Sequence, residues 1–332
     1  MKDFETLLLT RKQISALLPF SDYFNAVEAA FKAHAENQSL GQGLLHLDSR
    51  GGEFHIKGGG LQLGKIYFAF KINGGFYQNT NLRGLPNIIG TITLCDGESG
   101  YPLAIMDSGE ITRQRTAAAA AVAAKRLARP DANTITICGC GTQGRAQLSA
   151  MKWLLPIRKA YAFDVDATQR QQFAANLSLE LEIPVEPVDE PGPAIRESDI
   201  AVTCTPSRQA YVKAADVRPG TFIAAMGADS PEKQELDSSV LASSKLVVDI
   251  LAQCEKVGEL HHALEAGAMR REQVHAELGE IVAERKPGRT SRDEITVFDS
   301  TGTALQDVAA AAAVYEKALA ANMGTRFNFL LG

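Results

Sequence analysis

The chain has 332 residues, more than one hydrophobic core usually organises, so two domains are expected. Hydrophobic residues make up 45% and charged residues 22% of the sequence, which is ordinary for a soluble globular protein and excludes extensive disorder. The formal net charge is −5 without any basic block, which argues against a nucleic-acid partner. Neither a signal peptide nor an apolar run of membrane-spanning length is evident, so we expect a cytoplasmic protein without a membrane partner.

The cysteines are few, odd in number and scattered, a usage that fits reduced thiols better than a disulfide framework. Cys138 and Cys140 stand only two residues apart, which raises a metal or redox role as an alternative to simple packing. No second ligand pair has matching spacing, so we interpret both as small packing residues and predict no metal site.

The first third of the chain predicts one amphipathic helix followed by a sheet. Apolar residues recur at helical spacing over residues 21–36, behind a Ser-Asp start. Short β-rich pieces with many glycines follow from His46 to Leu94, which indicates an antiparallel or mixed sheet. The stretch "TRQRTAAAAAVAAKRLARPDA" then predicts a strong helix that ends before Pro130.

From Thr134 onward strands and helices alternate. A strand over Thr134–Cys138 precedes helices over about 143–155 and 167–181, and the segments "DIAVTCT", "TFIAAMG" and "KLVVDI" are apolar strands of the kind buried on both faces of a parallel sheet. We therefore predict an α/β fold with a doubly wound, parallel-sheet Rossmann domain over 115–303. A second alanine-rich helix closes the chain and is expected to return to the N-terminal domain, so that 304–332 complete 1–114 as a discontinuous α+β domain.

The stretch "ITICGCGTQGRAQ" carries glycines at the G-x-G-x-x-G spacing of a dinucleotide-binding turn: Gly139, Gly141 and Gly144. The spacing alone is weak, but an apolar strand precedes it, a helix-forming stretch follows it, and Asp164 ends the next strand 20 residues beyond Gly144. The first glycine allows a tight turn, the second lets backbone approach a pyrophosphate, and the third allows close helix packing.

The helix that follows the turn begins near Thr142 and Gln143, and its free N–H groups would hold the phosphates. Asp164 would accept hydrogen bonds from the ribose hydroxyls and repel a 2′-phosphate, which favours NAD (NADH) over NADP. The competing interpretation of Asp164, a helix cap in "DVDATQR", suits Asp166 better.

Several longer strings resemble the ornithine cyclodeaminase/μ-crystallin family: "RTAAAAAVAAKRLARPDA", "CGCGTQG", "TCTPSR", "MGADSPEKQELD" and "EITVFDSTGTALQDVAAA". The resemblance runs from about residue 20 to 325, and archaeal-type alanine dehydrogenases are the closest-looking branch, with some iminosuccinate reductase-like features. It implies a homodimer whose discontinuous domain forms the interface and much of the substrate site. It also implies chemistry on the carbon–nitrogen bond at the α-carbon of an amino or imino acid.

The resemblance assigns roles to particular residues. Lys71 and Arg115 match residues that hold the substrate carboxylate, and Lys71 is also placed among the catalytic groups. Asp229 matches an acid beside the nicotinamide that would exchange a proton with the amine or imine. Each has a plainer alternative: a strand cation for Lys71, a surface arginine for Arg115, and a turn former before Ser230 for Asp229. Further cofactor contacts are implied for Thr116, Thr203, Thr205, Pro206, Ser207, Met226, Gly227 and Ser300.

The substrate side departs from the family pattern. Leu44 stands where many members have a basic residue, and Lys57 and Gly58 replace a Met-Pro pair. His55 stands where alanine dehydrogenases have another basic residue. Our hypothesis is that Lys57 supplies the missing cation, with His55 and Asn87 as further substrate-binding candidates. Because three cations exceed what one carboxylate needs, a dicarboxylic substrate is a possible consequence. The alternative is that Lys57 is a solvated strand cation.

Three classes of function follow from these patterns. The leading one is an NAD(H)-dependent oxidoreductase of the alanine dehydrogenase or imine, ketimine or iminosuccinate reductase type, acting on a small amino or imino acid. The first alternative is a cyclodeaminase-type lyase that releases ammonia with catalytic NAD. The second is a non-catalytic, crystallin-like protein that binds NAD(P)H.

Overall fold

The computed structural model describes residues 5–330 and divides the chain into two compact units. The first unit comprises Met1–Arg115 and Thr303–Gly332, and the second comprises Thr116–Gly302. The first unit is therefore discontinuous in sequence, and the division falls inside one long helix, α4 (Ser108–Leu127). No helix of the described part of the chain is long and apolar enough to cross a membrane.

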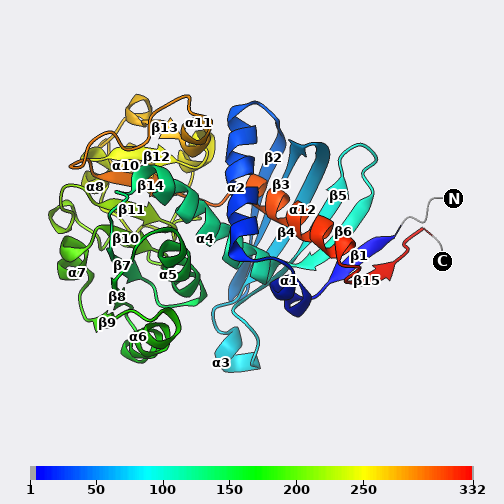
Figure 1. The fold of residues 1–332 in the computed structure, drawn as a ribbon, viewed down its shortest axis with the longest axis horizontal. Helices are drawn as coiled ribbons and strands as arrows, with labels where there is room; N and C mark the ends of the chain where they lie inside the picture. Colours follow the sequence, from blue (N-terminus) through cyan, green and yellow to red (C-terminus); the bar gives the residue numbers. More distant parts are fainter. Residues whose placement is uncertain (1–4, 331–332) are drawn as a thin grey trace. The chain divides into compact units, whose positions relative to one another are not determined.

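The first unit is built on a seven-stranded mixed sheet in the order β15-β1-β6-β5-β4-β3-β2 (Figure 1). Strands β2 to β6 form an antiparallel meander, whereas β1 pairs in parallel with β6. The strands are β1 (Thr6–Leu9), β2 (Ser39–Ser49), β3 (Gly52–Leu63), β4 (Lys65–Gly75), β5 (Ile88–Asp96), β6 (Pro102–Asp107) and β15 (Thr325–Phe327).

Helices cover one face of this sheet. The C-terminal helix α12 (Ala304–Ala320) packs on β3 and β4 and against α2 (Phe20–Ala35), as Figure 1 shows. The run of buried alanines in α12 lets the helix axis approach the sheet closely. The approach is so close that a side chain at Gly59 of β3 would come within 3.0 Å of Ala304. Two short helices, α1 (Arg11–Leu17) and α3 (Asn79–Arg83), complete the unit.

The opposite face of the same sheet carries large apolar side chains that are exposed. Because alternate residues of a strand point to opposite faces, the cross-strand pairing of Leu47 with Phe54 and of Ile56 with Ile72 brings these side chains together on that face. Phe54, Phe70 and Ile72 are all exposed. Contiguous exposed apolar surface of this kind marks an interaction site.

The second unit is an eight-stranded sheet in the order β13-β12-β14-β11-β10-β7-β8-β9, and every pairing in it is parallel. The chain runs outward from β7 to β9 and then returns to the other side with β10, so the strand order reverses between β7 and β10. The doubly wound fold expected from the sequence is confirmed. Ligands of such sheets bind beside the carboxyl ends of the strands at this reversal.

The central strands of the second unit are short and mostly buried, as expected for strands covered on both faces, whereas the edge strand Val185–Val188 exposes Glu186 and Pro187. They are β7 (Thr134–Cys138), β8 (Lys159–Phe163), β9 (Val185–Val188), β10 (Ile200–Thr203), β11 (Phe222–Ala225), β12 (Lys245–Val248), β13 (Ala276–Glu277) and β14 (Thr296–Asp299). The helices are α5 (Thr142–Leu154), α6 (Ala167–Leu181), α7 (Pro191–Glu197), α8 (Ser238–Ala242), α9 (Leu251–Cys254), α10 (Glu259–Glu265) and α11 (Leu278–Val282), with 3-10 turns at Ala214–Asp216 and Arg271–Gln273.

Candidate cofactor and substrate sites

The glycine turn after β7 has the geometry that its spacing predicts. Gly139 has a φ of +104°, and a side chain there would lie 2.8 Å from the carbonyl oxygen of Cys204. A side chain at Gly144 would come within 2.0 Å of the carbonyl oxygen of Gly139, so only glycine permits helix α5 to start this close to β7. Gly141 differs, because the nearest atom to its missing side chain is 3.9 Å away. The backbone at Gly141 therefore faces open space, where a ligand can approach it.

Asp164 follows β8 and faces the same turn. One of its carboxylate oxygens accepts the N–H of Cys140 at 2.8 Å, and the other accepts the N–H of Asp166 at 3.0 Å. Asp166, rather than Asp164, caps helix α6 by accepting the N–H groups of Thr168 and Gln169. The Asp164 carboxylate is thus fixed at the end of β8 without serving as the helix cap.

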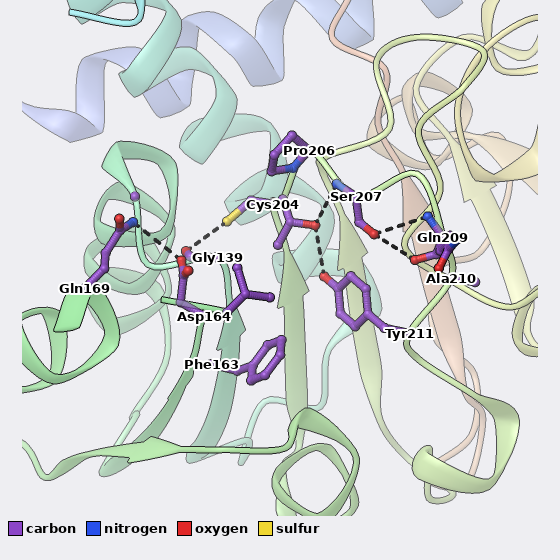
Figure 2. A pocket seen from close by; sticks show the side chains of 13 residues that line it. Gly139, Phe163, Asp164, Gln169, Cys204, Pro206, Ser207, Gln209, Ala210 and Tyr211 are labelled. Carbon is purple, nitrogen blue, oxygen red and sulfur yellow. Dashed lines mark hydrogen bonds between the residues drawn. The ribbon is translucent and has the colours of Figure 1, made fainter. Parts of the chain in front are cut away.

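A cavity of about 510 Å³ opens beside the turn, within the size range of small-molecule sites (Figure 2). Asp164 and Gln169 face one another on one side of it, and Ser207 and Gln209 lie on the other. The lining residues are Gly139, Gly141, Phe163, Asp164, Val165, Gln169, Cys204, Thr205, Pro206, Ser207, Gln209, Ala210 and Tyr211.

Six of the cofactor residues expected from the sequence line this cavity, and the others lie elsewhere in the unit. Thr142 and Gln143 form the first turn of α5, and Thr203 is the last residue of β10. Met226 and Gly227 follow β11, and Ser300 follows β14, so these residues stand at the carboxyl edge of the sheet. Thr116 is buried in α4, where its carbonyl oxygen accepts a hydrogen bond from Gln147 at 3.4 Å.

Sequence reasoning missed several residues of the cavity wall, among them Val165, Gln169 and Tyr211. Val165 had a recognisable signal, because it is an apolar residue directly after Asp164 and is 91% exposed. An exposed apolar side chain that lines a cavity is a suitable surface for a planar ring. Gln169 lies in the first turn of α6. Tyr211 comes from the loop after β10, whose path cannot be read from local sequence.

The sequence also gave no indication of Glu235, a fully buried carboxylate that joins two loops of the crevice. One of its oxygens accepts the N–H and hydroxyl of Thr205, both at 2.7 Å, and the hydroxyl of Tyr211 at 2.9 Å. The other accepts the N–H of Gly227 at 2.9 Å. Burial raises the pKa of Glu235, and the bonds from Thr205 and Tyr211 oppose that shift. Glu235 therefore ties the segment after β10 to the segment after β11.

A second buried carboxylate, Asp249 after β12, holds the loop that follows β14. It accepts the N–H of Gly302 at 2.8 Å, the hydroxyl of Thr301 at 3.0 Å and that of Ser300 at 3.2 Å. The neighbouring Asp299 is also buried, and burial, with Asp249 nearby, raises its pKa to about 7. The loop containing Ser300 is therefore positioned by a carboxylate below it.

The first unit holds a buried cluster of four charged side chains: Lys57, Lys71, Arg115 and Asp307. Lys57 of β3 lies directly opposite Lys71 of β4, so the two side chains share the face of the sheet covered by α12. Asp307 in the first turn of α12 lies 2.7 Å from Lys71 and 3.0 Å from the Arg115 Nε. Arg115 also donates to Gln306 at 2.7 Å.

The electrostatics of this cluster favour an added anion. Burial, together with the positive charges of Arg115 and Lys57, lowers the pKa of Lys71 to about 7 against the opposing effect of Asp307. Burial would raise the pKa of Asp307, but Arg115 and Lys71 bring it below its ordinary value. When all four are ionised, three cations stand against one carboxylate. A buried excess of positive charge is costly unless an anion joins it.

The remaining predicted site residues have defined partners. His55 lies two residues before Lys57 on β3, and its Nε2 is 3.2 Å from Glu53. The side-chain oxygen of Asn87 accepts the N–H and the hydroxyl of Thr80, both at 3.1 Å, so this end of Asn87 organises the loop around α3. In the second unit, Asp229 follows β11 and forms an ion pair with Lys233 at 2.6 Å.

A model of the ornithine cyclodeaminase/mu-crystallin family matches residues 4–322, which is nearly the whole chain. The chain belongs to this family. The resemblance drawn from its motifs is thus confirmed. The alanine dehydrogenase of Archaeoglobus fulgidus is 39% identical over 331 residues, covering 98% of this chain and 99% of that protein. The iminosuccinate reductase of Paracoccus denitrificans is 34% identical, covering 94% of this chain and 96% of that protein.

The same relationship is visible among solved structures. An archaeal alanine dehydrogenase dimer with bound NAD matches this structure with a TM-score of 0.92 and 38% identity, covering 98% of this chain and 100% of that one. At this level of similarity the family member shares both the doubly wound sheet and the second sheet unit.

The hydrogen bonds of Glu235 can be used to test whether the cavity beside the glycine turn binds NADH. Glu235→Gln removes one of the two acceptor oxygens, so either Thr205 or Gly227 loses its partner and the loop is released. We expect a loss of about 2 kcal/mol in NADH binding, or about 30-fold in Kd, measured by fluorescence titration. Glu232→Gln, a change at an exposed acid three residues away, is the control and should bind NADH like the wild type. Equal NADH affinity in the Glu235 variant would show that this carboxylate does not position the crevice.

Proposed function

We propose that the protein is an NAD(H)-dependent oxidoreductase that acts on the carbon–nitrogen bond at the α-carbon of a small amino or imino acid. The observation that carries the proposal is the buried cluster of Lys57, Lys71 and Arg115 around Asp307, a ready site for a carboxylate. The glycine turn and the cavity beside Asp164 supply the second requirement, a place for a dinucleotide. Among relatives of this family, alanine dehydrogenase and iminosuccinate reductase both carry names that fit this chemistry.

In this proposal the first unit binds the substrate acid. The Arg115 guanidinium offers a planar pair of donors to a carboxylate, and Lys71 adds a compact charge beside it. Asp307 holds both side chains in place through its ion pairs. Bound NADH supplies the hydride for the reduction of the imine carbon.

Asp229 is the proposed proton acceptor and donor. It follows β11 at the carboxyl edge of the parallel sheet, and its carboxylate lies 2.6 Å from Lys233 Nζ. In this proposal the carboxylate accepts a proton from the substrate amine. The reverse transfer returns the proton to the product amine. Asp229 and Lys71 are therefore the proposed catalytic residues.

The substrate carries a second acidic group. Leu44 of β2 lies directly opposite Lys57 of β3, so Lys57 is the cross-strand neighbour of the position where the family resemblance places a basic residue. A cation moved to the facing strand occupies the same face of the sheet and can serve the same carboxylate region. In this proposal Lys71 and Arg115 hold one carboxylate and Lys57 contacts the second.

The proposed cofactor is NAD(H) rather than NADP(H). The Asp164 carboxylate lines the cavity and would lie against the hydroxyls of the adenosine ribose, where it repels a 2′-phosphate. The proposed compartment is the cytoplasm, where the five free cysteines would stay reduced.

The activity is tested with a panel of 2-oxo acids and cyclic imino acids, each supplied with NADH or NADPH and, for the oxo acids, with ammonium. The expected result is oxidation of NADH with an acidic substrate, and a much weaker rate with NADPH. Ammonia release from a diamino acid without net NADH formation would identify a cyclodeaminase instead. Tight NADH binding with no turnover of any compound would contradict an enzymatic role.

The role of Lys57 has its own test. Lys57→Met should raise KM for a dicarboxylic substrate at least about 10-fold while leaving KM for its monocarboxylic analogue within about twofold, because only the second carboxylate loses its partner. Steady-state kinetics with 2-oxobutanedioate and 2-oxobutanoate compare the two directly. An unchanged KM for both acids would remove Lys57 from the substrate site.

Lys71 predicts a pH dependence. A lysine whose pKa is lowered to about 7 loses its charge as the pH rises through that value. The affinity of the site for a carboxylate should therefore fall above pH 7. The Kd of a non-reacting 2-hydroxy acid with the NAD⁺-loaded enzyme should therefore increase between pH 7 and pH 9. Lys71→Arg keeps its charge and should flatten this profile. A flat wild-type profile would contradict the assignment.

The exposed apolar face of the first unit suggests a homodimer, which is the state of the archaeal alanine dehydrogenase in the similar solved structure. Introducing Glu at both Phe70 and Ile72 would place charges in that face and should convert the protein to monomers, as measured by light scattering after gel filtration. Leu179→Glu is the control, because Leu179 is an exposed leucine of α6 in the other unit. A double variant that stays dimeric would exclude this face as the interface.

A further inference from the structure

Two histidines and a glutamate converge near the tip of the β2–β3 hairpin. His46 lies directly opposite His55, and Asp48 lies directly opposite Glu53, so all four side chains project from the same face of the hairpin. The two imidazole rings pack edge to face with centroids 4.7 Å apart. The ligand atoms of His46, Glu53 and His55 all lie within 4.8 Å of one another.

The distances among these atoms match those between the ligands of one metal ion. With zinc–ligand bonds of about 2.0–2.1 Å, two ligands of a tetrahedral site lie about 3.3 Å apart. His55 Nε2 is 3.2 Å from one oxygen of Glu53, and His46 Nε2 is 3.7 Å from the other. Asp48 Oδ1 is 3.2 Å from His46 Nε2. The two separations of 3.2 Å are close to the tetrahedral spacing, and that of 3.7 Å exceeds it.

The surroundings also suit a metal ligand set. The hydroxyl of Tyr77 donates to Glu53 at 3.3 Å, and such an outer hydrogen bond fixes the orientation of a coordinating carboxylate. The hairpin supplies a defined frame, because its strands pair without a register shift from the Gln42–Gly59 pair to the Ser49–Gly52 pair. Without a metal, the same contacts would be ordinary hydrogen bonds from two imidazoles to one carboxylate, and this is the alternative to be tested.

We propose that His46, Glu53 and His55 form a binding site for a divalent transition-metal ion of the zinc or nickel class. Two imidazoles and a carboxylate are the ligands that these ions accept, and calcium and magnesium favour oxygen ligands alone. Three protein ligands leave a fourth position, which Asp48, water or an anionic oxygen can occupy. This proposal does not rest on the proposed enzymatic activity. It differs from the prediction of no metal site, which was based on the spacing of the cysteines.

Its position suggests a use. His55 and Lys57 are alternate residues of β3 and face the same side of the sheet. A bound metal would add positive charge and an open coordination position to the face that carries Lys57 and Lys71. An anionic ligand on that face would then bind more tightly with the metal present.

The second histidine cluster of the described residues provides a matched control. On α10, His261, His262 and Glu265 also place ligand atoms within 4.8 Å of one another. There, however, His262 Nε2 already lies 2.9 Å from the carbonyl oxygen of Lys233, which leaves that nitrogen engaged. We therefore expect the hairpin, and not α10, to bind the metal.

The experiment uses the full chain without a histidine tag, stripped with a chelator and titrated with Zn²⁺ by calorimetry and with Co²⁺ by visible absorbance. We expect the wild type to bind one ion per chain and to show the Co²⁺ absorption bands of a nitrogen–oxygen site. The double variant His46→Gln/His55→Gln should lose both the bound ion and these bands. The variant His261→Gln/His262→Gln should keep both. Tyr77→Phe should weaken Zn²⁺ binding about 10-fold, as expected for an outer-sphere partner.

Two outcomes would overturn the proposal. Wild-type protein that binds no Zn²⁺ or Co²⁺ would show that the cluster is only a hydrogen-bonded group. Binding that persists unchanged in the hairpin variant would place the metal elsewhere. His46 is exposed, so its replacement is expected to leave the fold intact. Circular dichroism and thermal unfolding of both variants and the wild type check this before titration.

Discussion

The ion pairs of Asp307 with Lys71 and Arg115 are the interaction on which the first unit and its proposed site depend. They join three segments that lie far apart in sequence: strand β4, the first half of α4 and the first turn of the C-terminal helix α12. Removing one partner of a buried pair leaves an uncompensated charge, which costs about 3–5 kcal/mol. The same contacts that fix α12 on the sheet therefore also hold the cations in position for an acid.

The second unit uses buried carboxylates in a comparable way. Glu235 joins the segments after β10 and β11, and Asp249 holds the loop after β14. All three segments follow strands of one parallel sheet, so their ends meet at the edge where ligands of this fold bind. The strands position the loops roughly, and the two carboxylates fix their backbone N–H groups.

Local rules in the sequence predicted much of this structure. The helices expected over 143–155 and 167–181 appear as α5 (Thr142–Leu154) and α6 (Ala167–Leu181), because periodicity and the glycine turn act within a few residues. The cross-strand pairs depend on strand register, which no short segment of sequence encodes. These pairs are Lys57 with Lys71, Lys57 with Leu44, and His46 with His55. Glu235 was missed for a related reason, since one of its partners, Thr205, lies 30 residues earlier in the chain.

The central claim is that the Asp307 cluster receives the carboxylate of the substrate. The most direct measurement is the steady-state kinetics of Arg115→Met beside its NADH affinity. If the claim is right, KM for the acidic substrate rises at least about 30-fold, and the Kd of NADH stays within about twofold of the wild type. An unchanged KM in a folded variant would contradict the account, because Arg115 would then bind no part of the substrate.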